Sequence, residues 1–329
     1  MQGNDLSAAQ MVETMHQIMS GKCTDAQIGG LLVALRCKGE SVDEVAAAAE
    51  VMRELATRVR CKSSDLIDIV GTGGDGASTF NISTASALVC AAAGLKVAKH
   101  GNRAISSRSG AADLLEAAGV NIELDPEQVA ECVDQVGIGF MFAPRHHGAM
   151  RYAINARRDL GMRTIFNMLG PLTNPADAPR QVMGVYSKEL VKPMAEVLQK
   201  LGSGRAMVVH AADGMDEISV SSDTFVAELA DGQIDTYSIS PEQFSMQRVD
   251  AENIKVDGAA QSLDVINAVF ANHPGPARDI VALNAGAAIF IGGLAESHQA
   301  GIDRALEILS SGEASSKLGE LVECSNGFS

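Results

Sequence analysis

Short apolar runs that alternate with helical segments from residue 66 onwards are the feature that most constrains how this chain can fold. Strand-like runs rich in β-branched residues occur at 66–70, 95–98, 120–124, 138–142, 181–186 and 205–210. Helical segments are predicted to begin near Ser83, Ala111 and Asp125. Strands that alternate with helices are typical of a mostly parallel sheet with helices on its faces. The sequence therefore predicts an α/β fold.

The first sixty residues have a different texture, with three helical patterns and no strand-like run. Ser7 can cap the first helix, while Thr24 and Ser41 form capping-box patterns with Gln27 and Glu44. We predict a small helical domain over residues 1–63. A large α/β domain with a mostly parallel central sheet is expected over residues 64–329.

The later segments add a hairpin and a buried helix. Residues 224–229 and 234–239 flank Asp231-Gly232, a turn typical of β-hairpins. The longest apolar segment, 280–294, is shorter than the roughly 20 residues that span a bilayer, so we predict a buried helix and no membrane partner. The N-terminus does not resemble a signal peptide, and the six cysteines are scattered. A reducing, cytoplasmic location is expected.

The distribution of charge favours a small anionic ligand. The formal net charge of −15 would repel a polyanion such as DNA, so we expect no nucleic-acid partner. Nine of the 26 Lys and Arg residues nevertheless fall within residues 96–108 and 145–163. An acidic protein that concentrates its positive charge in this way is suited to bind a small anion. A pair of solvated basic helix faces is the alternative.

Residues 71–76, Gly-Thr-Gly-Gly-Asp-Gly, follow the first predicted strand and formally match two nucleotide motifs. A dinucleotide site needs an acid about 20 residues further on, at the end of the next strand, where this chain has Lys99 and His100. A P-loop needs a lysine at position 77, which is Ala77. Both nucleotide interpretations are therefore disfavoured.

The same glycines predict a phosphate cradle, because they let backbone N–H groups approach a ligand closely and permit positive φ. The next helix begins, at its positive end, with side chains that add hydroxyls and an amide: Thr79, Asn81, Ser83 and Thr84. Asp75 would repel a bare phosphate, so we expect it to meet a sugar hydroxyl, an amide or a metal-bound water. On these residues alone, an ordinary glycine turn with an N-cap is the alternative.

Two further loops are expected to face the same crevice. Residues 99–107 form a donor-rich loop after the second strand, and parallel strands end at one edge of a sheet. A third loop after His210 carries Asp213, Asp216 and Glu217. Adjacent carboxylates in a loop are a normal way to hold Mg²⁺, which keeps several waters and takes one or two protein carboxylates. With two anion-binding loops nearby, these acids predict a Mg²⁺ site.

Together these segments resemble the anthranilate phosphoribosyltransferase family. The matching runs are 68–76 (Asp-Ile-Val-Gly-Thr-Gly-Gly-Asp-Gly), 79–84 (Thr-Phe-Asn-Ile-Ser-Thr), 99–103 (Lys-His-Gly-Asn-Arg), 157–161 (Arg-Arg-Asp-Leu-Gly), 163–175 (Arg-Thr-Ile-Phe-Asn-Met-Leu-Gly-Pro-Leu-Thr-Asn-Pro) and 216–217 (Asp-Glu). The resemblance spans nearly the whole chain. One departure is Gly148, after His146 and His147, where the family usually has proline; it bears on the stiffness of that loop.

The resemblance implies a fold shared with the pyrimidine nucleoside phosphorylases, with helices from about 163–200 joining the small domain. It also implies a homodimer of the stand-alone form, without a glutamine amidotransferase segment. The implied reaction moves the phosphoribosyl group of phosphoribosyl pyrophosphate (PRPP) onto the amine of anthranilate, on the pathway to tryptophan, with Mg²⁺ as cofactor.

The same resemblance implies the site residues. PRPP would be held by Gly71, Gly74, Asp75, Thr79, Asn81, Ile82, Ser83, Thr84, Lys99, His100, Gly101, Asn102, Arg103, Ala104, Ile105, Ser106 and Ser107. Anthranilate would be held by Gly71, His100, Asn102 and Arg157. Mg²⁺ would be served by Ser83, Asp216 and Glu217.

This chemistry fits the residues. Loss of pyrophosphate builds opposite charges on the ribose and the leaving group, so electrostatic stabilisation by Lys99 and the loop amides matters more than a protein nucleophile, and none is expected. Arg157 could grip the carboxylate of anthranilate in a bidentate pair. His146 and His147 are interpreted as structural. A nucleoside phosphorylase on the same fold and a nucleic-acid-binding relative are the alternatives, and phosphorolysis of thymidine or a salt-dependent shift of DNA would favour one or the other.

Overall fold

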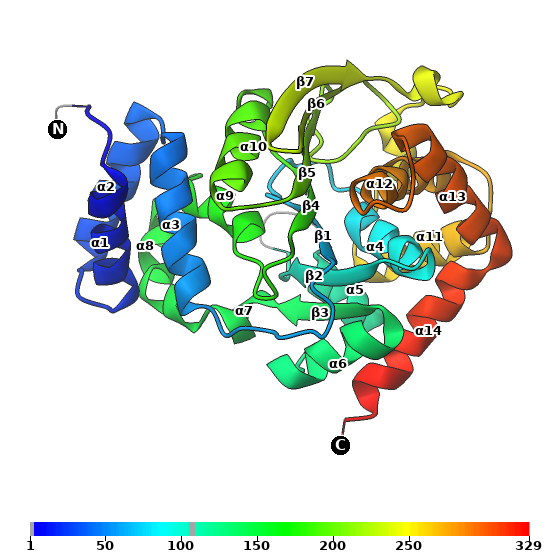
Figure 1. Cartoon of the computed structure of the whole chain (residues 1–329), viewed down its shortest axis with the longest axis horizontal. Coiled ribbons are helices and arrows are strands. Elements are labelled where there is room, and N and C mark those ends of the chain that lie inside the picture. Colours follow the sequence, from blue (N-terminus) through cyan, green and yellow to red (C-terminus); the bar gives the residue numbers. More distant parts are fainter. Residues whose placement is uncertain (1–2, 105–108, 329) are drawn as a thin grey trace.

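The computed structural model describes residues 3–104 and 109–328, and a seven-stranded sheet lies at its centre (Figure 1). The strands are β1 (Leu66–Gly71), β2 (Lys96–Gly101), β3 (Ile138–Phe142), β4 (Arg180–Gly184), β5 (Arg205–Ala211), β6 (Thr224–Ala230) and β7 (Gln233–Ile239). Their spatial order is β3-β2-β1-β4-β5-β6-β7. The first five are parallel, and β6 and β7 form the predicted antiparallel hairpin.

The order of the strands reverses between β1 and β4. From β1 the chain adds β2 and β3 on one side, then crosses back to place β4 on the other side. The two strands are in register up to their carboxyl ends, where Gly71 pairs with Gly184. Ligands of open α/β sheets bind outside the carboxyl ends of strands at such a switch point. The glycine loop therefore begins at the place where this topology favours a ligand.

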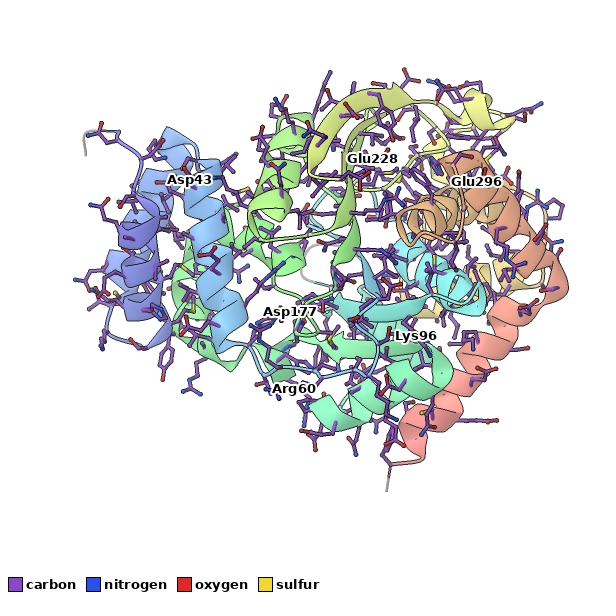
Figure 2. The ribbon with its side chains drawn as sticks, in the orientation of Figure 1. Asp43, Arg60, Lys96, Asp177, Glu228 and Glu296 are labelled. Carbon is purple, nitrogen blue, oxygen red and sulfur yellow. The ribbon has the colours of Figure 1, made fainter. Side chains whose placement is uncertain are left out.

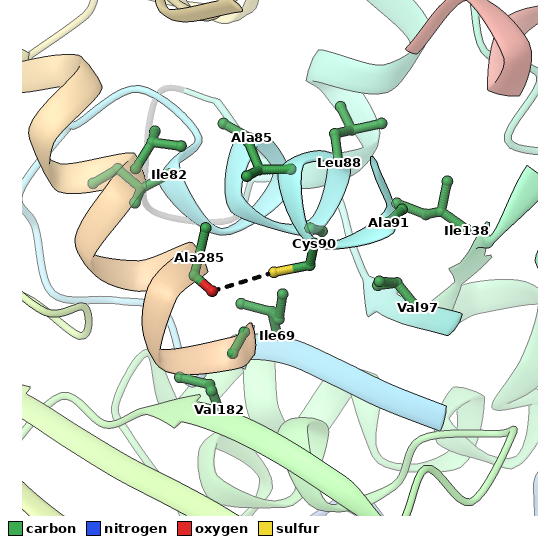
Figure 3. Close-up of a cluster of buried hydrophobic side chains, with 14 of the residues drawn as sticks. Ile69, Ile82, Ala85, Leu88, Cys90, Ala91, Val97, Ile138, Val182 and Ala285 are labelled. Atoms are coloured by element: carbon green, nitrogen blue, oxygen red, sulfur yellow. Dashed lines mark hydrogen bonds between the residues drawn. The ribbon is translucent and has the colours of Figure 1, made fainter. Parts of the chain in front are cut away.

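One face of the sheet is covered by helices that follow β1 and β2 and by the helices of the C-terminal region. Its helices are α4 (Ile82–Ala92), α5 (Ala111–Ala117), α6 (Pro126–Val136), α11 (Ala259–Phe270), α12 (Pro276–Ile291), α13 (His298–Ser311) and α14 (Glu313–Asn326). Small residues let α4 and α12 pack closely, and the buried Cys90 thiol donates to the Ala285 carbonyl at 3.5 Å (Figure 3). α12 is the buried helix predicted from the apolar segment. Every helix in the described ranges is too short or too polar to cross a bilayer.

The opposite face carries the N-terminal helices. They are α1 (Ala8–Met19), α2 (Asp25–Lys38) and α3 (Val42–Leu55), joined by α8 (Ile154–Leu160), α9 (Ile165–Leu172) and α10 (Val191–Lys200), with the single turn α7 (Ala143–His146) leading in. Ser7, Thr24 and Ser41 cap α1 to α3, as the sequence predicts. The core of this unit continues through α9 and α10 onto the sheet at Met183 and Val208.

Two sequence predictions about the strands are wrong. Residues 120–124 pair with no strand in the described chain. The Asn121 N–H donates instead to Ser325 Oγ of α14 at 3.1 Å, and the Glu123 N–H donates to Asn121 Oδ1 at 3.0 Å. Val120, Ile122 and Leu124 are still buried, so the alternation signals burial on one face and not a ladder. The second strand also extends through Gly101, which makes Lys99 and His100 strand residues and not loop residues.

The crossing of α12 and α13 depends on two facing glycines. A Cβ placed on Gly301 would overlap the Gly286 carbonyl oxygen, and one placed on Gly286 would lie 2.6 Å from the Ile302 nitrogen. We expect Gly301→Ala to lower the free energy of unfolding by about 1–3 kcal/mol, measured by urea denaturation. Gly319→Ala in α14, which faces open space, is the control and should stabilise by about 0.5–1 kcal/mol. Equal stabilities of the Gly301→Ala and Gly319→Ala variants would contradict the close contact between Gly301 and Gly286.

Candidate active site

The glycine loop after β1 folds around a carboxylate from another loop. Gly73, Gly74 and Gly76 have φ values of 66°, 76° and 73°, the left-handed region that glycine adopts without strain. This conformation turns the Gly73 N–H toward Asp216 Oδ2, to which it donates at 2.7 Å. Asp75 accepts the Ala77 N–H through Oδ1 at 3.1 Å, and its carboxyl group also interacts with that of Asp216. The loop is therefore held by an acid 143 residues further along the chain.

Glycines at two strand ends make room for that acid. A Cβ on Gly71 would collide with the Asp216 carboxylate, and one on Gly184 would lie 2.5 Å from the Asp216 carbonyl carbon. The loop after β5 thus passes directly over the β1–β4 switch point. Larger residues at either glycine would displace Asp216 and the adjacent Glu217.

The two acids carry unfavourable electrostatics in the folded chain. Burial raises the pKa of Asp216, and the nearby Asp75 raises it further. Burial also raises the pKa of Glu217, as does Asp216, while Lys99 opposes both effects. Carboxylates that repel one another in a buried place are stabilised when a cation neutralises them. Their arrangement therefore favours a bound cation.

The N-terminus of α4 forms the floor beside these acids. Asn81 caps the helix by accepting the Thr84 N–H at 3.2 Å, and the Ser83 amide hydrogen-bonds Glu217. Thr84 is buried, and its hydroxyl has no hydrogen-bond partner among the described residues. Ile82 points its side chain into the core, so only its backbone faces the site (Figure 3).

Thr79 is fixed from a distant segment. It pairs with Lys255 in an isolated bridge, and Val256 N–H donates to the Ser78 carbonyl at 2.9 Å. Residues 78–80 therefore enter α4 along a fixed path, which sets the direction of the helix N-terminus.

Lys99 is in the sheet and nearly fully buried, with 2% of its surface exposed. Its ammonium donates to the Ile69 carbonyl at 2.7 Å and to Ser83 Oγ at 3.3 Å. Burial lowers its pKa, while Asp68 and Glu217 favour the charged form. The sequence predicts that Lys99 begins an exposed loop, and this is wrong because Lys99 is buried in β2. Its ammonium nevertheless places positive charge beside Ser83 and Glu217.

His100 is also buried. Its ring packs edge-on against His147 with 5.0 Å between centroids, and it hydrogen-bonds the Gly170 carbonyl. Burial lowers the pKa of His100 well below its usual range and that of His147 to about 4. Both rings are therefore neutral near pH 7. His146 is buried as well and contacts the Thr57 carbonyl at 3.0 Å through Nδ1, in keeping with a structural role.

The rest of the second loop is only partly described. Gly101 ends β2, and Asn102 is exposed and accepts the Arg103 N–H through Oδ1 at 2.8 Å. The Arg103 guanidinium is paired with Glu116 and Asp113 of α5, and Asp113 also accepts the Ala104 N–H at 2.9 Å. Ile105, Ser106 and Ser107 lie outside the described residues.

Two arginines come from the segment that leads into α9. Arg157 on α8 is partly buried over the Phe166 ring, 5.2 Å from its centroid, and has no carboxylate partner within the described ranges. Arg163 donates to the Gly74 carbonyl and lies over the Tyr186 ring. Arg163 was not among the predicted site residues, although it begins the 163–175 run that carried the resemblance.

Other cations of the two basic stretches are already paired with groups of the protein. Lys96 donates to the Val133 and Asp134 carbonyls at the C-terminus of α6, at the other end of β2 from the glycine loop (Figure 2). Arg145 pairs with Glu123 and Asp125. The solvated-face alternative therefore accounts for part of the basic character. Arg151 and Arg163 are exposed and hydrogen-bond Tyr152 and the Gly74 carbonyl, whereas Arg157 is partly buried and its guanidinium makes no ion pair or hydrogen bond within the described ranges.

The arrangement can bind a phosphorylated ligand with a cation. Backbone amides of the glycine loop, the N-terminus of α4 and the buried Lys99 provide positive potential, while Asp216 and Glu217 supply oxygen ligands. The described residues contain no group of three or more His, Cys, Asp or Glu that could hold a metal ion. Such a donor set fits Mg²⁺, which uses one or two carboxylates and keeps its waters.

Comparison with known families agrees with this arrangement. The α/β domain of a glycosyl transferase family matches residues 63–315, and the helical bundle domain of a glycosyl transferase family matches residues 1–56. A protein of Thioalkalivibrio sulfidiphilus named anthranilate phosphoribosyltransferase is 58% identical over 318 residues, which cover 97% of this chain and 94% of the relative.

Solved structures agree at the level of the fold. Anthranilate phosphoribosyltransferase from Thermus thermophilus superposes with a TM-score of 0.94 at 44% identity, covering 98% of this chain and 97% of the other. The Saccharomyces cerevisiae enzyme in complex with PRPP and Mg gives a TM-score of 0.89 at 27% identity, covering 98% and 94%. The yeast enzyme is also known in complex with 4-fluoroanthranilate. With matches of this identity over nearly its full length, the chain belongs to the anthranilate phosphoribosyltransferase family.

Proposed function

We propose that this chain transfers the phosphoribosyl group of PRPP to the amine of anthranilate, giving N-(5-phosphoribosyl)anthranilate and pyrophosphate in tryptophan biosynthesis. The observation that carries this proposal is the glycine loop folded around Asp216 at the switch point, beside the N-terminus of α4. That geometry offers amides to a phosphorylated ligand and carboxylates to its cation.

The glycine loop, residues 79–84 and residues 99–104 are the proposed PRPP-binding segments. Free amides of the loop and the N-terminus of α4 would receive the phosphate oxygens. Asp75, in the middle of the loop, is proposed to accept a ribose hydroxyl. Lys99 adds positive potential from beneath the helix start, since it is bonded to Ser83 and buried. These residues orient the ligand and exclude water.

Mg²⁺ is the proposed cofactor, held by Asp216, Glu217 and Ser83. Burial raises the pKa of both acids, and repulsion from neighbouring carboxylates raises it further, which supports a cation between them. When bound, Mg²⁺ would neutralise charge on the pyrophosphate oxygens.

Anthranilate is proposed to lie against Arg157, Asn102, His100 and Gly71. Arg157 is a partly buried cation without an acid, which suits the carboxylate of the acceptor in a bidentate pair. The lowered pKa of His100 keeps its ring neutral, so it does not compete for that carboxylate. The aromatic amine of anthranilate is already neutral at pH 7, so orientation supplies much of the rate and no protein nucleophile is required.

We further propose that the protein is a homodimer in the cytoplasm. Each chain is proposed to divide into a small domain over residues 1–63 and a large domain over residues 64–329. Continuity of the core from the N-terminal helices into α9 and α10 supports one small unit that includes helices from about 163–200. Gel filtration with light scattering tests the dimer, and a mass of 34.3 kDa in solution would contradict it.

The direct test follows the loss of anthranilate fluorescence when protein, PRPP and Mg²⁺ are mixed with anthranilate. Loss that depends on protein, on PRPP and on Mg²⁺ is expected. Release of thymine from thymidine and phosphate, with no loss of fluorescence, would replace this function with nucleoside phosphorolysis on the same fold.

Arg157→Ala is expected to raise the KM for anthranilate about 10- to 100-fold, because a charge-assisted pair contributes about 1.5–3 kcal/mol. The KM for PRPP should change little, as measured by steady-state kinetics with each substrate varied in turn. The matched control is Arg158→Ala, which removes an exposed arginine that already contacts Asn155 and Asp159. Equal effects on both KM values would remove Arg157 from the acceptor site.

A further inference from the structure

The ladder between β1 and β2 stops before the strands end. Its paired residues are Leu66 with Lys96 and Ile67 with Val97, whereas the β1–β4 ladder continues to Gly71 and the β2–β3 ladder continues to Gly101. Beyond Ile67, the two strands that carry the phosphate loop and the second loop are therefore no longer joined by backbone hydrogen bonds.

Side chains replace the missing ladder bonds. Ala98 and His100 face β1 by the alternation of the strand, and Ile69 faces β2. The His100 N–H donates to Asp68 Oδ1 at 3.2 Å. The Ala98 carbonyl accepts from Asn174 Nδ2 at 2.8 Å, and the Ile69 carbonyl accepts from Lys99 Nζ at 2.7 Å. Three backbone groups that a ladder would satisfy are each satisfied by a side chain.

Asp68 and Asn174 also bind each other. Asn174 Nδ2 donates to Asp68 Oδ2 at 2.8 Å, and Asn174 Oδ1 accepts the Ala176 N–H at 2.9 Å. Asp68 is fully buried and Asn174 is 5% exposed. The carboxylate and the amide therefore form a closed pair in which each oxygen and each nitrogen is used, and the pair lies between β1 and β2.

Asn174 connects this gap to the junction with the helical unit. It follows the end of α9, where Arg53 of α3 donates to the Leu172 carbonyl at 2.7 Å and Val59 N–H donates to the Pro175 carbonyl at 3.0 Å. α9 is the helix that carries Phe166, against which Arg157 packs. A shift of Asn174 would thus reach both the two loops and the arginine proposed to hold the acceptor.

We propose that Asp68 and Asn174 are positioning residues for phosphoribosyl transfer, which hold the ends of β1 and β2 apart and fix the donor loop relative to the acceptor side. The proposal rests on the proposed function. Neither side chain is required to touch a substrate; both act through the backbone of Ile69 to Gly71 and of Ala98 to Gly101. The predicted effect is on the orientation of the bound substrates.

Asp68→Asn is the first test, because it is isosteric and places an amide donor against the donor of Asn174. We expect kcat to fall about 100-fold, the loss associated with misplacing reacting groups by about 1 Å, while both KM values stay within about threefold. Asn174→Ala should give the same split between kcat and KM. It serves in place of Asp68→Asn if that variant does not fold.

Ser325→Ala is the control, since it removes a buried side-chain acceptor of a backbone N–H in α14, outside the candidate site. It should lower the unfolding temperature and leave kcat within about twofold.

The outcomes separate the two proposals. If wild-type protein consumes no anthranilate, the proposed function fails. If wild type is active but the kcat of folded Asp68→Asn or Asn174→Ala is unchanged, the positioning role is overturned. Circular dichroism at the assay temperature establishes the folded fraction, so a fall in activity that only mirrors unfolding also overturns it.

Discussion

Replacing Asp216 and Glu217 together by alanine is expected to lower kcat by more than about a thousandfold, because it removes the proposed oxygen ligands of Mg²⁺. The double variant also loses the Asp216 carboxylate, which accepts the Gly73 N–H at 2.7 Å, so the glycine loop loses its fixed shape. Steady-state rates across a Mg²⁺ titration measure the effect. In wild type, rate should rise with Mg²⁺ and saturate; in the double variant, this dependence should be weak.

The stability of the same variant should move in the opposite direction. Burial and mutual repulsion raise the pKa of both carboxylates, so at pH 7 their charges oppose folding, and removing them relieves that strain. We expect an unfolding temperature in the absence of Mg²⁺ that is equal to or above that of wild type. The control is Glu127→Ala with Glu323→Ala, which removes the same charge from exposed positions on α6 and α14. An unchanged Mg²⁺ titration in the Asp216 and Glu217 variant would contradict the metal role.

Gly184→Ala is expected to lower kcat about 100-fold, although position 184 is not itself expected to contact a substrate. Its Cβ would lie 2.5 Å from the Asp216 carbonyl carbon, so the loop that carries Asp216 and Glu217 must shift. Overpacking of this kind also destabilises by about 1–3 kcal/mol. Kinetics at saturating substrates, together with urea denaturation, measure both effects.

Gly204→Ala is the matched control for Gly184→Ala. Gly204 precedes β5, and a Cβ there would lie 3.7 Å from the Pro179 carbonyl oxygen, an ordinary contact. Its activity and stability should stay close to those of wild type. Wild-type kcat in the Gly184 variant would mean that the 213–217 loop can move without effect on turnover.

Local sequence signals were enough for the element types and for the order of the domains. Capping boxes at Thr24 and Ser41 satisfy orphan backbone donors within one turn, so they mark helix starts without tertiary help. The hairpin at Asp231-Gly232 is also a local structure. Residues 120–124 show the limit of such signals. Alternate burial there is real, but the partner is Ser325 of a helix more than 200 residues away.

For the charged residues of the site, too, the sequence identifies the residues but not their partners. The sequence marks Lys99 and Arg103 as cations of one loop, yet Lys99 is buried between strands while Arg103 pairs with acids of α5. Which cation faces a ligand depends on which acids the fold brings beside it. Arg157 stands out because it is partly buried over Phe166 and its guanidinium makes neither an ion pair nor a hydrogen bond among the described residues.

By itself, the sequence determined most of the helical and strand segments, the glycine loop and the adjacent acids at 216 and 217, because these depend on residue type and local spacing. Only the tertiary structure decided that Gly71 and Gly184 meet over Asp216, and that the Asp68–Asn174 pair replaces the ladder between β1 and β2. The contacts of the glycine loop with Asp216 and of Asp68 with Asn174 join residues more than 100 positions apart, and their geometry follows from the strand order and packing of the whole sheet.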